Sequence, residues 1–322
     1  MDRRQGLTVK TILALALLLV ILSGCNLPSP AAPATPTVSA PSPSPTETIP
    51  APSPAASVIE RTHPPSATPL PTITATPSPT VTLTPACTAT VGVIYTHKIT
   101  VAALTRPLQF NLYLPPCYDP EKAGGYPLLV MLHGQSYKQD QWMRLGMVEG
   151  ANALMSAGEI PPFLIVMPYE EFSLEPPFET GYDDAITDGL LPWLEANYNL
   201  CAERACRAIG GLSRGGSWAL YIGFTRWQLF GGIGGHSTPP FLGTDSWLGL
   251  WLGDMTEANY PRMYLDFGET DWLLEYMVPF RKKLVGYDFP HVWILREGGH
   301  TESYWSAHQE EYLRWYAEAW GD

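Results

Sequence analysis

Basic residues are scarce in this chain, which has 19 Lys and Arg against 31 Asp and Glu. Only four of the basic and three of the acidic residues lie within the first 86 positions, so residues 87–322 contain 15 basic and 28 acidic side chains, a formal charge of −13. Such a field repels a phosphate backbone, and no basic stripe interrupts it. The sequence therefore argues against nucleic acid as a partner and favours neutral substrates.

An apolar run of transmembrane length is also missing near the amino terminus. The run from Thr11 to Leu22 is too short to span a bilayer, and it follows three basic residues, as in a signal peptide. It ends at Leu22-Ser23-Gly24-Cys25, which resembles the lipobox of bacterial lipoproteins, in which the signal is cleaved before an acylated cysteine. We expect residues 1–24 to be a signal peptide and Cys25 to be the lipidation site, which would leave the protein outside the cytoplasm, anchored to the cell membrane. An uncleaved anchor and an ordinary signal with a chance cysteine are the alternatives.

Charged side chains are almost absent between residues 26 and 86, where only Glu47, Glu60 and Arg61 occur. The same stretch contains 17 of the 33 prolines, among many Ser, Thr and Ala residues. This composition cannot bury a core, so residues 25–86, with Cys25 at their start, are predicted to form a disordered spacer with polyproline II character. The folded domain is expected over residues 87–322.

Cysteine is rare, with five in the whole chain. Setting Cys25 aside leaves Cys87, Cys117, Cys201 and Cys206, an even number in a compartment where disulfides persist. Three pairings are possible; we favour Cys201–Cys206, which closes a short loop, together with Cys87–Cys117, which ties the start of the domain to its second strand. Because only one close cysteine pair exists, we expect no metal site.

Strand and helix patterns alternate along residues 87–322. An antiparallel pair is predicted at Val91–Val101 and Leu108–Leu114. Short apolar runs typical of strands buried on both faces follow at Leu128–Leu132, Phe163–Met167, Arg207–Gly210, Arg262–Phe267 and Val292–Leu295. Helical spacing of apolar residues occurs at Val148–Ala157, Asp183–Tyr198, Gly216–Trp227, Trp272–Leu284 and Thr301–Trp320, with Pro192 and Pro279 expected to kink or shorten two of these helices. This alternation predicts an α/β fold with a mostly parallel sheet flanked by helices and antiparallel strands at its amino-terminal edge.

The most specific motif is Gly211-Leu212-Ser213-Arg214-Gly215, a G-x-S-x-G sequence between a predicted strand and a predicted helix. In such an elbow the turn is so tight that the residues flanking the serine must be small, and the hydroxyl is exposed at the helix amino terminus. A bare G-x-S-x-G often occurs by chance, but here it has the required strand and helix on either side. Ser213 is therefore predicted to be a catalytic nucleophile.

A serine hydroxyl is a weak nucleophile, so it needs a base. In proteins with such a strand–turn–helix elbow, the base follows the serine in the chain. We predict that His300 is this base, because it lies in a Gly298-Gly299-His300 loop after the strand Val292–Leu295. His236, which directly follows Gly234-Gly235, is the rival, and otherwise a packing or substrate-lining residue.

The predicted acid is Asp271, which follows the strand Arg262–Phe267 through a short loop and would orient the imidazole of His300. Glu269 is a weaker alternative. Asp266 lies inside the strand, so we interpret it as structural.

Two backbone amides are needed to bind the oxyanion of the tetrahedral intermediate. One comes from the residue after the nucleophile, Arg214, and the other from the loop after the first central strand, where Gln135 follows Leu132-His133-Gly134. His133 is interpreted as holding this loop through hydrogen bonds, with a place at the substrate pocket as a second possibility.

The chain resembles the esterase D and feruloyl esterase-like group of α/β-hydrolases, which also contains enterochelin esterases and mycolyltransferases. The resemblance covers nearly all of residues 87–322, and it rests on Leu132-His133-Gly134, Asp183-Asp184 with Leu191-Pro192, Arg207 to Gly216, Phe230-Gly231-Gly232 with His236-Ser237, and Gly298-Gly299-His300. It implies the α/β-hydrolase fold and assigns nucleophile, acid, base and oxyanion donors to Ser213, Asp271, His300, and Gln135 with Arg214. Arg214 departs from the family, which commonly has an uncharged residue there, and suggests a structural salt bridge or a contact with an acidic leaving group.

Two loops are predicted to shape the substrate pocket, the acidic and aromatic segment Tyr169–Tyr182 and the segment Thr238–Tyr260. Within the second, Trp247 and Trp251 are candidate substrate-lining residues, as are His133 and His236; the alternative is a cap that packs on the core. The aromatic stripe Trp305, Tyr312, Trp315 and Tyr316 has helical spacing and is interpreted as core packing.

Together these features predict a serine esterase that hydrolyses carboxylic esters through an acyl-enzyme without metal or organic cofactor. The expected substrate is a small-molecule or polysaccharide-linked ester. Acyl transfer by the same triad and a surface-tethered protein that binds a glycan or siderophore are the alternatives.

Overall fold

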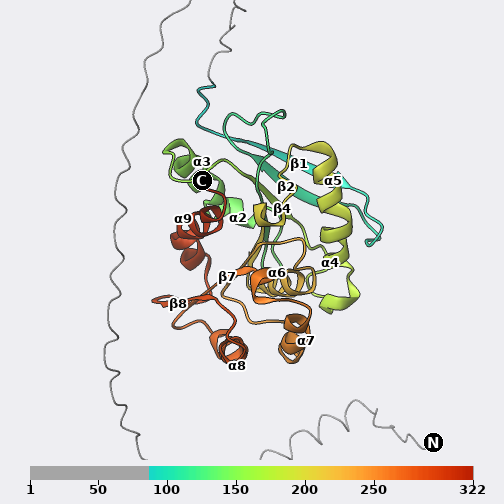
Figure 1. Cartoon of the computed structure of the whole chain (residues 1–322), viewed down its shortest axis with the longest axis vertical. Helices are drawn as coiled ribbons and strands as arrows, with labels where there is room; N and C mark the ends of the chain where they lie inside the picture. The colour runs from blue at the N-terminus through green and yellow to red at the C-terminus, as the bar shows by residue number, and fades with distance from the viewer. Residues whose placement is uncertain (1–86, 322) are drawn as a thin grey trace, which may run out of the picture. The chain divides into compact units, whose positions relative to one another are not determined.

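The computed structural model describes residues 87–321, so the predicted signal peptide, Cys25 and the spacer lie outside the described residues. A single sheet of eight strands crosses the domain in the order β1-β2-β4-β3-β5-β6-β7-β8 (Figure 1). The strands are β1 (Val93–Ile99), β2 (Leu108–Leu114), β3 (Leu128–Leu132), β4 (Leu164–Pro168), β5 (Arg207–Leu212), β6 (Gly232–His236), β7 (Arg262–Gly268) and β8 (Val292–Arg296). The pairs β1–β2 and β2–β4 are antiparallel and all other pairs are parallel, which confirms the predicted sheet.

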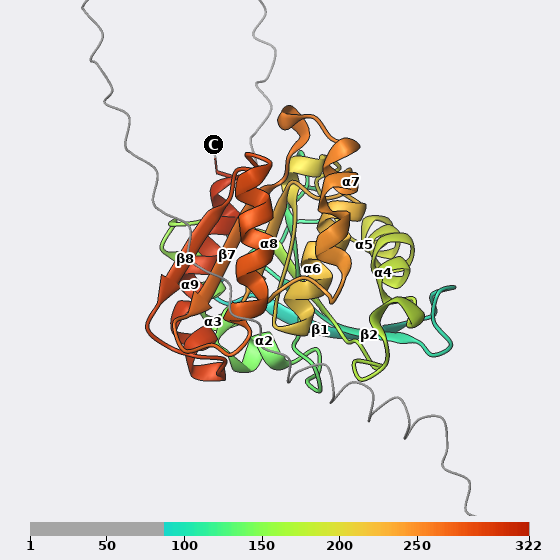
Figure 2. The same cartoon turned by 90° about the horizontal axis from the view of Figure 1, so that it is seen from below.

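Helices cover both faces of this sheet. They are α2 (Gln141–Arg144), α3 (Met147–Ser156), α4 (Tyr182–Asp184), α5 (Leu191–Asn197), α6 (Arg214–Thr225), α7 (Leu248–Gly253), α8 (Leu274–Gly286) and α9 (Glu302–Glu318). Figure 1 shows α3 and α9 together on one side of the sheet and α4 and α5 on the other. Figure 2 shows α6 and α8 side by side on the same face as α5, where Phe224 and Phe280 contact each other with ring centroids 6.3 Å apart.

Alternate residues of the central strands enter two separate cores. Val130 of β3 and Ile209 of β5 pack with α5, α6 and α8, whereas Leu129 and Ala208 pack with α3 and α9. All residues of β3, β4 and β5 are buried, as the continuous apolar runs predict. The same prediction is wrong for β8, which lies at the edge of the sheet and has no buried residue. The sheet is therefore fixed from both sides, and its carboxyl edge provides a rigid base for the loops that follow β3, β5, β7 and β8.

Strand β6 was not predicted as a strand, because three of its five residues are glycine. The reason lies in the packing of α9 against the sheet. A Cβ atom on Gly234 would lie 1.7 Å from the Tyr316 hydroxyl oxygen, and one on Gly210 of β5 would lie 1.8 Å from it. The glycines therefore leave room for a buried tyrosine, and the same choice removes the apolar side chains that mark a strand.

The helix predicted at Asp183–Tyr198 is broken into three parts. A π-helical stretch, η2 (Ala185–Leu190), separates α4 from α5, and Pro192 stands in the first turn of α5. Proline has no N–H and its ring displaces the carbonyl one turn earlier, which explains the break. Pro279 lies inside α8, which is nevertheless one uninterrupted helix of 13 residues.

Two short helices, α2 and α7, had not been predicted. Short 3₁₀ turns complete the secondary structure at η1 (Pro177–Glu179), η3 (Arg204–Cys206), η4 (Thr244–Trp247) and η5 (Glu257–Asn259). Within residues 87–321, no helix combines the length and apolar character that crossing a membrane requires.

The structure contains the two disulfides that the sequence favours, Cys87–Cys117 and Cys201–Cys206. The first joins residues 30 positions apart and closes a loop around the β1–β2 hairpin at the sheet edge. The second joins residues five positions apart, just before β5.

Removing the longer disulfide should destabilise the domain more than removing the shorter one. In the chain-entropy description, closing the Cys87–Cys117 loop restricts the unfolded chain by roughly 3–4 kcal/mol, and closing the Cys201–Cys206 loop by about 2 kcal/mol. Chemical denaturation of the double variants C87S/C117S and C201S/C206S measures this difference directly. An equal loss of unfolding free energy in the two variants would contradict it.

Candidate active site

Ser213 lies in the sharp turn between β5 and α6 and has a positive φ of 53°, which is uncommon for a residue with a side chain. The flanking glycines allow this turn. A Cβ atom on Gly211 would lie 2.4 Å from the Gly215 carbonyl carbon, and one on Gly215 would lie 2.4 Å from the carbonyl oxygen of Leu132 in β3. The strand, turn and helix predicted around the G-x-S-x-G motif are all present.

The loops after β7 and β8 bring Asp271 and His300 to Ser213. The His300 Nε2 atom is 3.0 Å from Ser213 Oγ, and its Nδ1 atom is 3.2 and 3.1 Å from the two Asp271 carboxylate oxygens. The Leu273 amide donates to Asp271 Oδ1 over 2.9 Å and holds the carboxylate in place. The structure thus assembles the predicted acid, base and nucleophile in hydrogen-bonding order.

The two loops are also bonded to each other. The amide and the hydroxyl of Thr270 both donate to the Gly298 carbonyl, over 2.9 and 2.7 Å. Gly268 must be a glycine here, because a Cβ atom on it would lie 2.4 Å from the Gly298 carbonyl carbon. These contacts fix the distance between the acid and the base. Glu269, the alternative acid, makes no side-chain hydrogen bond to His300.

Two tryptophans frame the His300 ring. Trp305 meets it edge-on with centroids 5.0 Å apart, and Trp272 does so at 5.3 Å. The His300 side chain is 15% exposed, whereas Trp272 is 62% exposed. Trp305, interpreted from the sequence as core packing only, is buried but also lines the site.

A cavity of about 710 Å³ opens over Ser213 and His300. Its wall is largely aromatic and apolar, with polar groups near the serine. The other lining residues are Gly134, Gln135, Ser136, Tyr137, Leu212, Arg214, Ser217, Pro239, Phe241, Trp272, Leu273, Thr301, Glu302 and Trp305.

Gln135 and Arg214, the predicted oxyanion donors, both border this cavity. Neither backbone amide donates to another group of residues 87–321, whereas the neighbouring Gly134 amide donates to the buried Gln141 Oε1 over 2.8 Å. The two amides are thus available to a bound oxygen beside Ser213. Their role remains a prediction.

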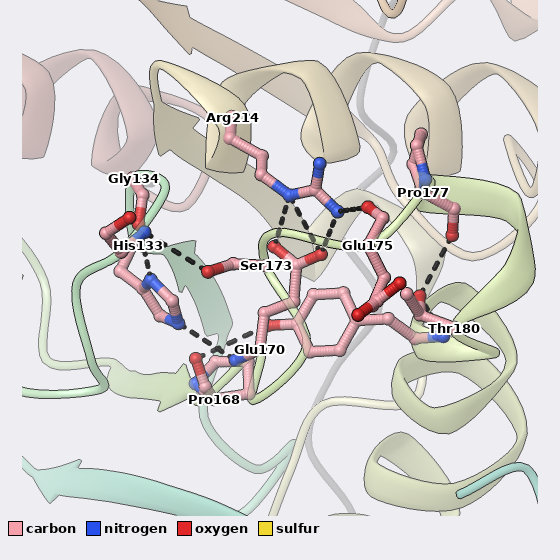
Figure 3. A network of polar contacts seen from close by, with 11 residues as sticks. His133, Gly134, Pro168, Glu170, Ser173, Glu175, Pro177, Thr180 and Arg214 are labelled. Carbon is pink, nitrogen blue, oxygen red and sulfur yellow. Dashed lines mark hydrogen bonds and ion pairs between the residues drawn. The ribbon is translucent and has the colours of Figure 1, made fainter. Parts of the chain in front are cut away.

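The Arg214 side chain forms a salt bridge with Glu170, shown in Figure 3. Its Nε donates to the two Glu170 oxygens over 3.0 and 2.9 Å, and its terminal nitrogen donates over 2.6 Å. Of the two interpretations of Arg214 in the sequence, the structure supports the structural salt bridge.

Neither His133 nor His236 lines the cavity, so the second possibility for His133 is wrong and its first interpretation, a role in holding the loop, is supported. His133 is buried and holds its own loop, with Nδ1 donating to the Gly134 carbonyl over 2.8 Å and Nε2 accepting from the Glu170 amide over 2.8 Å. His236 is fully buried on the α9 side of the sheet, where its Nδ1 lies 2.7 Å from Asp266. The rival base is therefore inaccessible to substrate.

Asp266 is structural, as interpreted, and it is the centre of a buried polar network. Its carboxylate accepts from the hydroxyls of Tyr304 and Tyr312 in α9, over 2.8 Å each. His236 completes the network by contacting the Tyr316 hydroxyl at 3.1 Å. Within the predicted aromatic stripe, Tyr312 and Tyr316 are thus core residues that also satisfy this buried histidine–carboxylate pair.

The aromatic residues predicted to line the pocket in segment Thr238–Tyr260 do not reach it. Trp251 is buried and stacks on Phe224 with centroids 5.4 Å apart, and Trp247 packs near Phe178 at 5.9 Å. Phe241, from the start of the same segment, lines the cavity instead. Segment Tyr169–Tyr182 contributes no lining residue and acts through Glu170, which holds Arg214.

Sequence reasoning missed Glu170, Gln141 and Trp272 as site residues. Trp272 directly follows the predicted acid, and that position could have indicated a place beside His300. Glu170 and Gln141 reach the site through side-chain contacts that local spacing does not encode. Within residues 87–321, no group of three or more His, Cys, Asp or Glu side chains is arranged to hold a metal ion.

The buried His133 should make the folded state sensitive to acid. Burial is the main reason that its pKa lies below the ordinary 6.5, with the Gly134 carbonyl, Glu170 and Asp140 opposing this shift and Arg214 adding to it. The unfolded chain takes up this proton near pH 6.5 and the folded chain only at lower pH. The contribution to stability is therefore complete above pH 6.5 and is lost as the pH falls below it.

We expect the Tm of His133→Asn to fall less steeply than that of the wild type between about pH 7.5 and pH 5, because asparagine does not titrate there. Circular dichroism melts across this range measure the two slopes. His97 and His308, whose pKa values burial also lowers, contribute alike to both proteins. Identical slopes would show that His133 is not the acid-sensitive group.

Comparisons with known proteins agree with this geometry. The chain is 29% identical over 136 residues to an endo-1,4-beta-xylanase/feruloyl esterase of Xylanibacter ruminicola, covering 38% of this chain and 18% of that protein. It is 30% identical over 157 residues to Esterase Rv1288 of Mycobacterium tuberculosis, covering 46% of this chain and 33% of that protein. The matched region thus spans a third or less of the length of these relatives.

Among solved structures, a ferulic acid esterase superposes with a TM-score of 0.63 at 22% identity, covering 72% of this chain and 99% of that one. At this identity the likeness shows the α/β-hydrolase fold. Residues 101–316, more than half of the chain, match the family described as "Putative esterase". This chain therefore belongs to that family, within the esterase D and feruloyl esterase-like group of α/β-hydrolases.

Proposed function

We propose that this protein is a serine carboxylic-ester hydrolase that acts through an acyl-enzyme on Ser213. The observation that carries the proposal is the continuous chain of hydrogen bonds from Asp271 through His300 to Ser213, at an open cavity. The positive φ of Ser213 adds to this, because it places the hydroxyl above the end of β5.

The geometry supports a two-step reaction. Asp271 accepts the hydrogen of His300 Nδ1, so Nε2 carries the lone pair that takes the proton as Ser213 Oγ attacks the ester carbonyl. The amides of Gln135 and Arg214 stabilise the oxyanion, and His300 then donates the proton to the leaving alcohol. Water repeats the sequence on the acyl-enzyme and releases the carboxylic acid.

Esters of aromatic acids are the substrates that the cavity suits best. Tyr137, Phe241, Trp272 and Trp305 line the cavity with Ser213 and offer flat apolar surfaces, against which aromatic rings pack favourably. The names of two similar proteins, a xylanase/feruloyl esterase and a ferulic acid esterase, point the same way. We therefore propose feruloyl-type esters, free or linked to a polysaccharide.

We further propose that the protein is exported and held at the cell surface by a lipid on Cys25. The sequence Leu22-Ser23-Gly24-Cys25 after an apolar run supports this, as does the long Pro, Ser and Thr spacer before the domain. Two disulfides in the folded domain also suit an oxidising compartment.

Ser213→Ala should abolish turnover of p-nitrophenyl esters and methyl ferulate and should prevent labelling by a fluorophosphonate. His300→Ala should lower kcat by a similar factor, and the double variant should add little, because the residues of a triad act as one unit.

Asp271→Asn should lower the rate by a factor on the order of 10⁴, because it disturbs the histidine tautomer. His236→Ala, in contrast, should affect stability and leave the chemistry in place. If His236→Ala were inactive and His300→Ala active, the assignment of His300 as the base would be wrong.

Cys25→Ser should release the protein from the membrane fraction or leave its signal peptide uncleaved. Fractionation of expressing cells, with metabolic labelling by a palmitate analogue, measures both results. Wild-type protein that is soluble and carries no fatty acid would refute the anchor, and the esterase proposal would stand unchanged.

A further inference from the structure

We propose that Glu170 is a positioning residue that couples the two oxyanion donors, Gln135 and Arg214. It does so with its carboxylate on one side and its backbone amide on the other. This inference rests on the proposed function, because it concerns groups that act only when an oxyanion forms beside Ser213. Figure 3 shows Glu170 between Arg214 and His133.

The carboxylate of Glu170 fixes the residue after the nucleophile. Glu170 follows β4 and is 2% exposed, and both of its oxygens accept hydrogen bonds from the Arg214 guanidinium. The same guanidinium donates to the Glu175 carbonyl over 3.1 Å. A guanidinium that is held at several atoms has little freedom, so Arg214, the first residue of α6 and a lining residue of the cavity, is held with it.

The backbone amide of Glu170 fixes the other donor through His133. This amide donates to Nε2 of His133, so the ring hydrogen must be on Nδ1, which donates to the Gly134 carbonyl. The Gly134 carbonyl and the Gln135 N–H belong to one planar peptide unit and point in opposite directions. Holding the carbonyl therefore sets the direction of the Gln135 N–H.

The loop after β3, which contains Gln135, is held by further hydrogen bonds, but these do not involve Arg214. The Gly134 amide donates to Gln141 Oε1 over 2.8 Å, and the Ser136 amide donates to Ser173 Oγ over 3.1 Å. Among residues 87–321, Glu170 alone hydrogen-bonds to both His133 and Arg214. It is thus the residue through which the two donors, from the loop after β3 and from α6, keep a common orientation.

The burial of this ion pair is itself informative. Removing two charges from water offsets much of their attraction, so a buried salt bridge often contributes little net stability compared with apolar side chains. The advantage of the pair must then lie elsewhere, and its position beside the nucleophile points to orientation. A preorganised donor is worth a factor of about 10²–10³ in kcat, so a small loss of alignment should be measurable.

Glu170→Gln is the direct test, because it keeps the shape and removes the charge that holds the Arg214 fork. We expect kcat for a p-nitrophenyl ester to fall about tenfold or more with KM nearly unchanged, since an oxyanion contact acts in the transition state. The matched control is Glu311→Gln on α9. Glu311 also accepts from both terminal nitrogens of an arginine, Arg296, over 2.7 and 2.8 Å, and it does not line the cavity. It should leave kcat unchanged.

The second arm is tested by His133→Gln, whose side-chain oxygen can still accept from the Glu170 amide but which places no donor at the Gly134 carbonyl. We expect a similar fall in kcat. The double variant with Glu170→Gln should lose less than the product of the single losses, because coupled residues are not additive. If Glu170→Gln does not fold, Arg214→Lys replaces it in the comparison of single and double variants. This substitution keeps the positive charge and removes the planar guanidinium that binds both carboxylate oxygens.

The outcomes separate the two proposals. A Ser213→Ala variant that keeps full activity would refute the esterase site and this inference with it. Activity that depends on Ser213 but is unchanged in Glu170→Gln, or that changes only in KM, would refute the inference alone. Losses that multiply in the double variant would show that Glu170 and His133 act independently and would also overturn the coupling.

Discussion

The close approach of the turn between β5 and α6 to the end of β3 is the constraint on which the site depends. Gly215 lies so near the carbonyl oxygens of Leu132 and His133 that even one methyl group would force the backbones apart. This contact places the amide of Arg214 beside the loop that contains Gln135. The same turn gives Ser213 its positive φ. Backbone packing therefore sets where Ser213 and the two predicted oxyanion donors lie.

Two histidine–carboxylate pairs occur in this domain, and their surroundings give them different roles. His300 with Asp271 borders the cavity, and its Nε2 faces a serine hydroxyl. His236 with Asp266 is fully buried, and its Nε2 faces a tyrosine of α9. The second pair anchors α9, whose amino-terminal turn directly follows His300. The buried pair His236–Asp266 thus supports α9, the helix that begins beside His300.

Much of the site could be predicted because tight turns leave strong sequence signals. Ser213 and Asp271 follow the buried strands β5 and β7, and His300 follows the edge strand β8, each within a few residues; glycines mark all three turns. The limits are equally physical. Strand β6 was missed because of its glycines, one of which, Gly234, leaves room for Tyr316, and no local pattern shows that a side chain 82 residues away will occupy that space.

The substrate-lining residues were the least predictable part, for a related reason. Trp247 and Trp251 have the composition of a binding surface, but the fold of the segment packs Trp251 on α6 and Trp247 near Phe178, and it leaves Phe241 at the cavity. Whether an aromatic residue of a loop faces substrate or core depends on the path of the whole loop, which spacing does not determine.

The charges at the cavity are consistent with a neutral substrate. Arg214 is paired with Glu170, Glu302 is paired with Arg144 at 3.2 Å, and the imidazole of His300 donates to the Asp271 carboxylate. None of these lining residues offers an unpaired charge to a ligand, while the domain as a whole carries an excess of acidic side chains. An anionic substrate would meet repulsion without a compensating partner, so we expect binding to come from apolar contact and from the two predicted oxyanion amides.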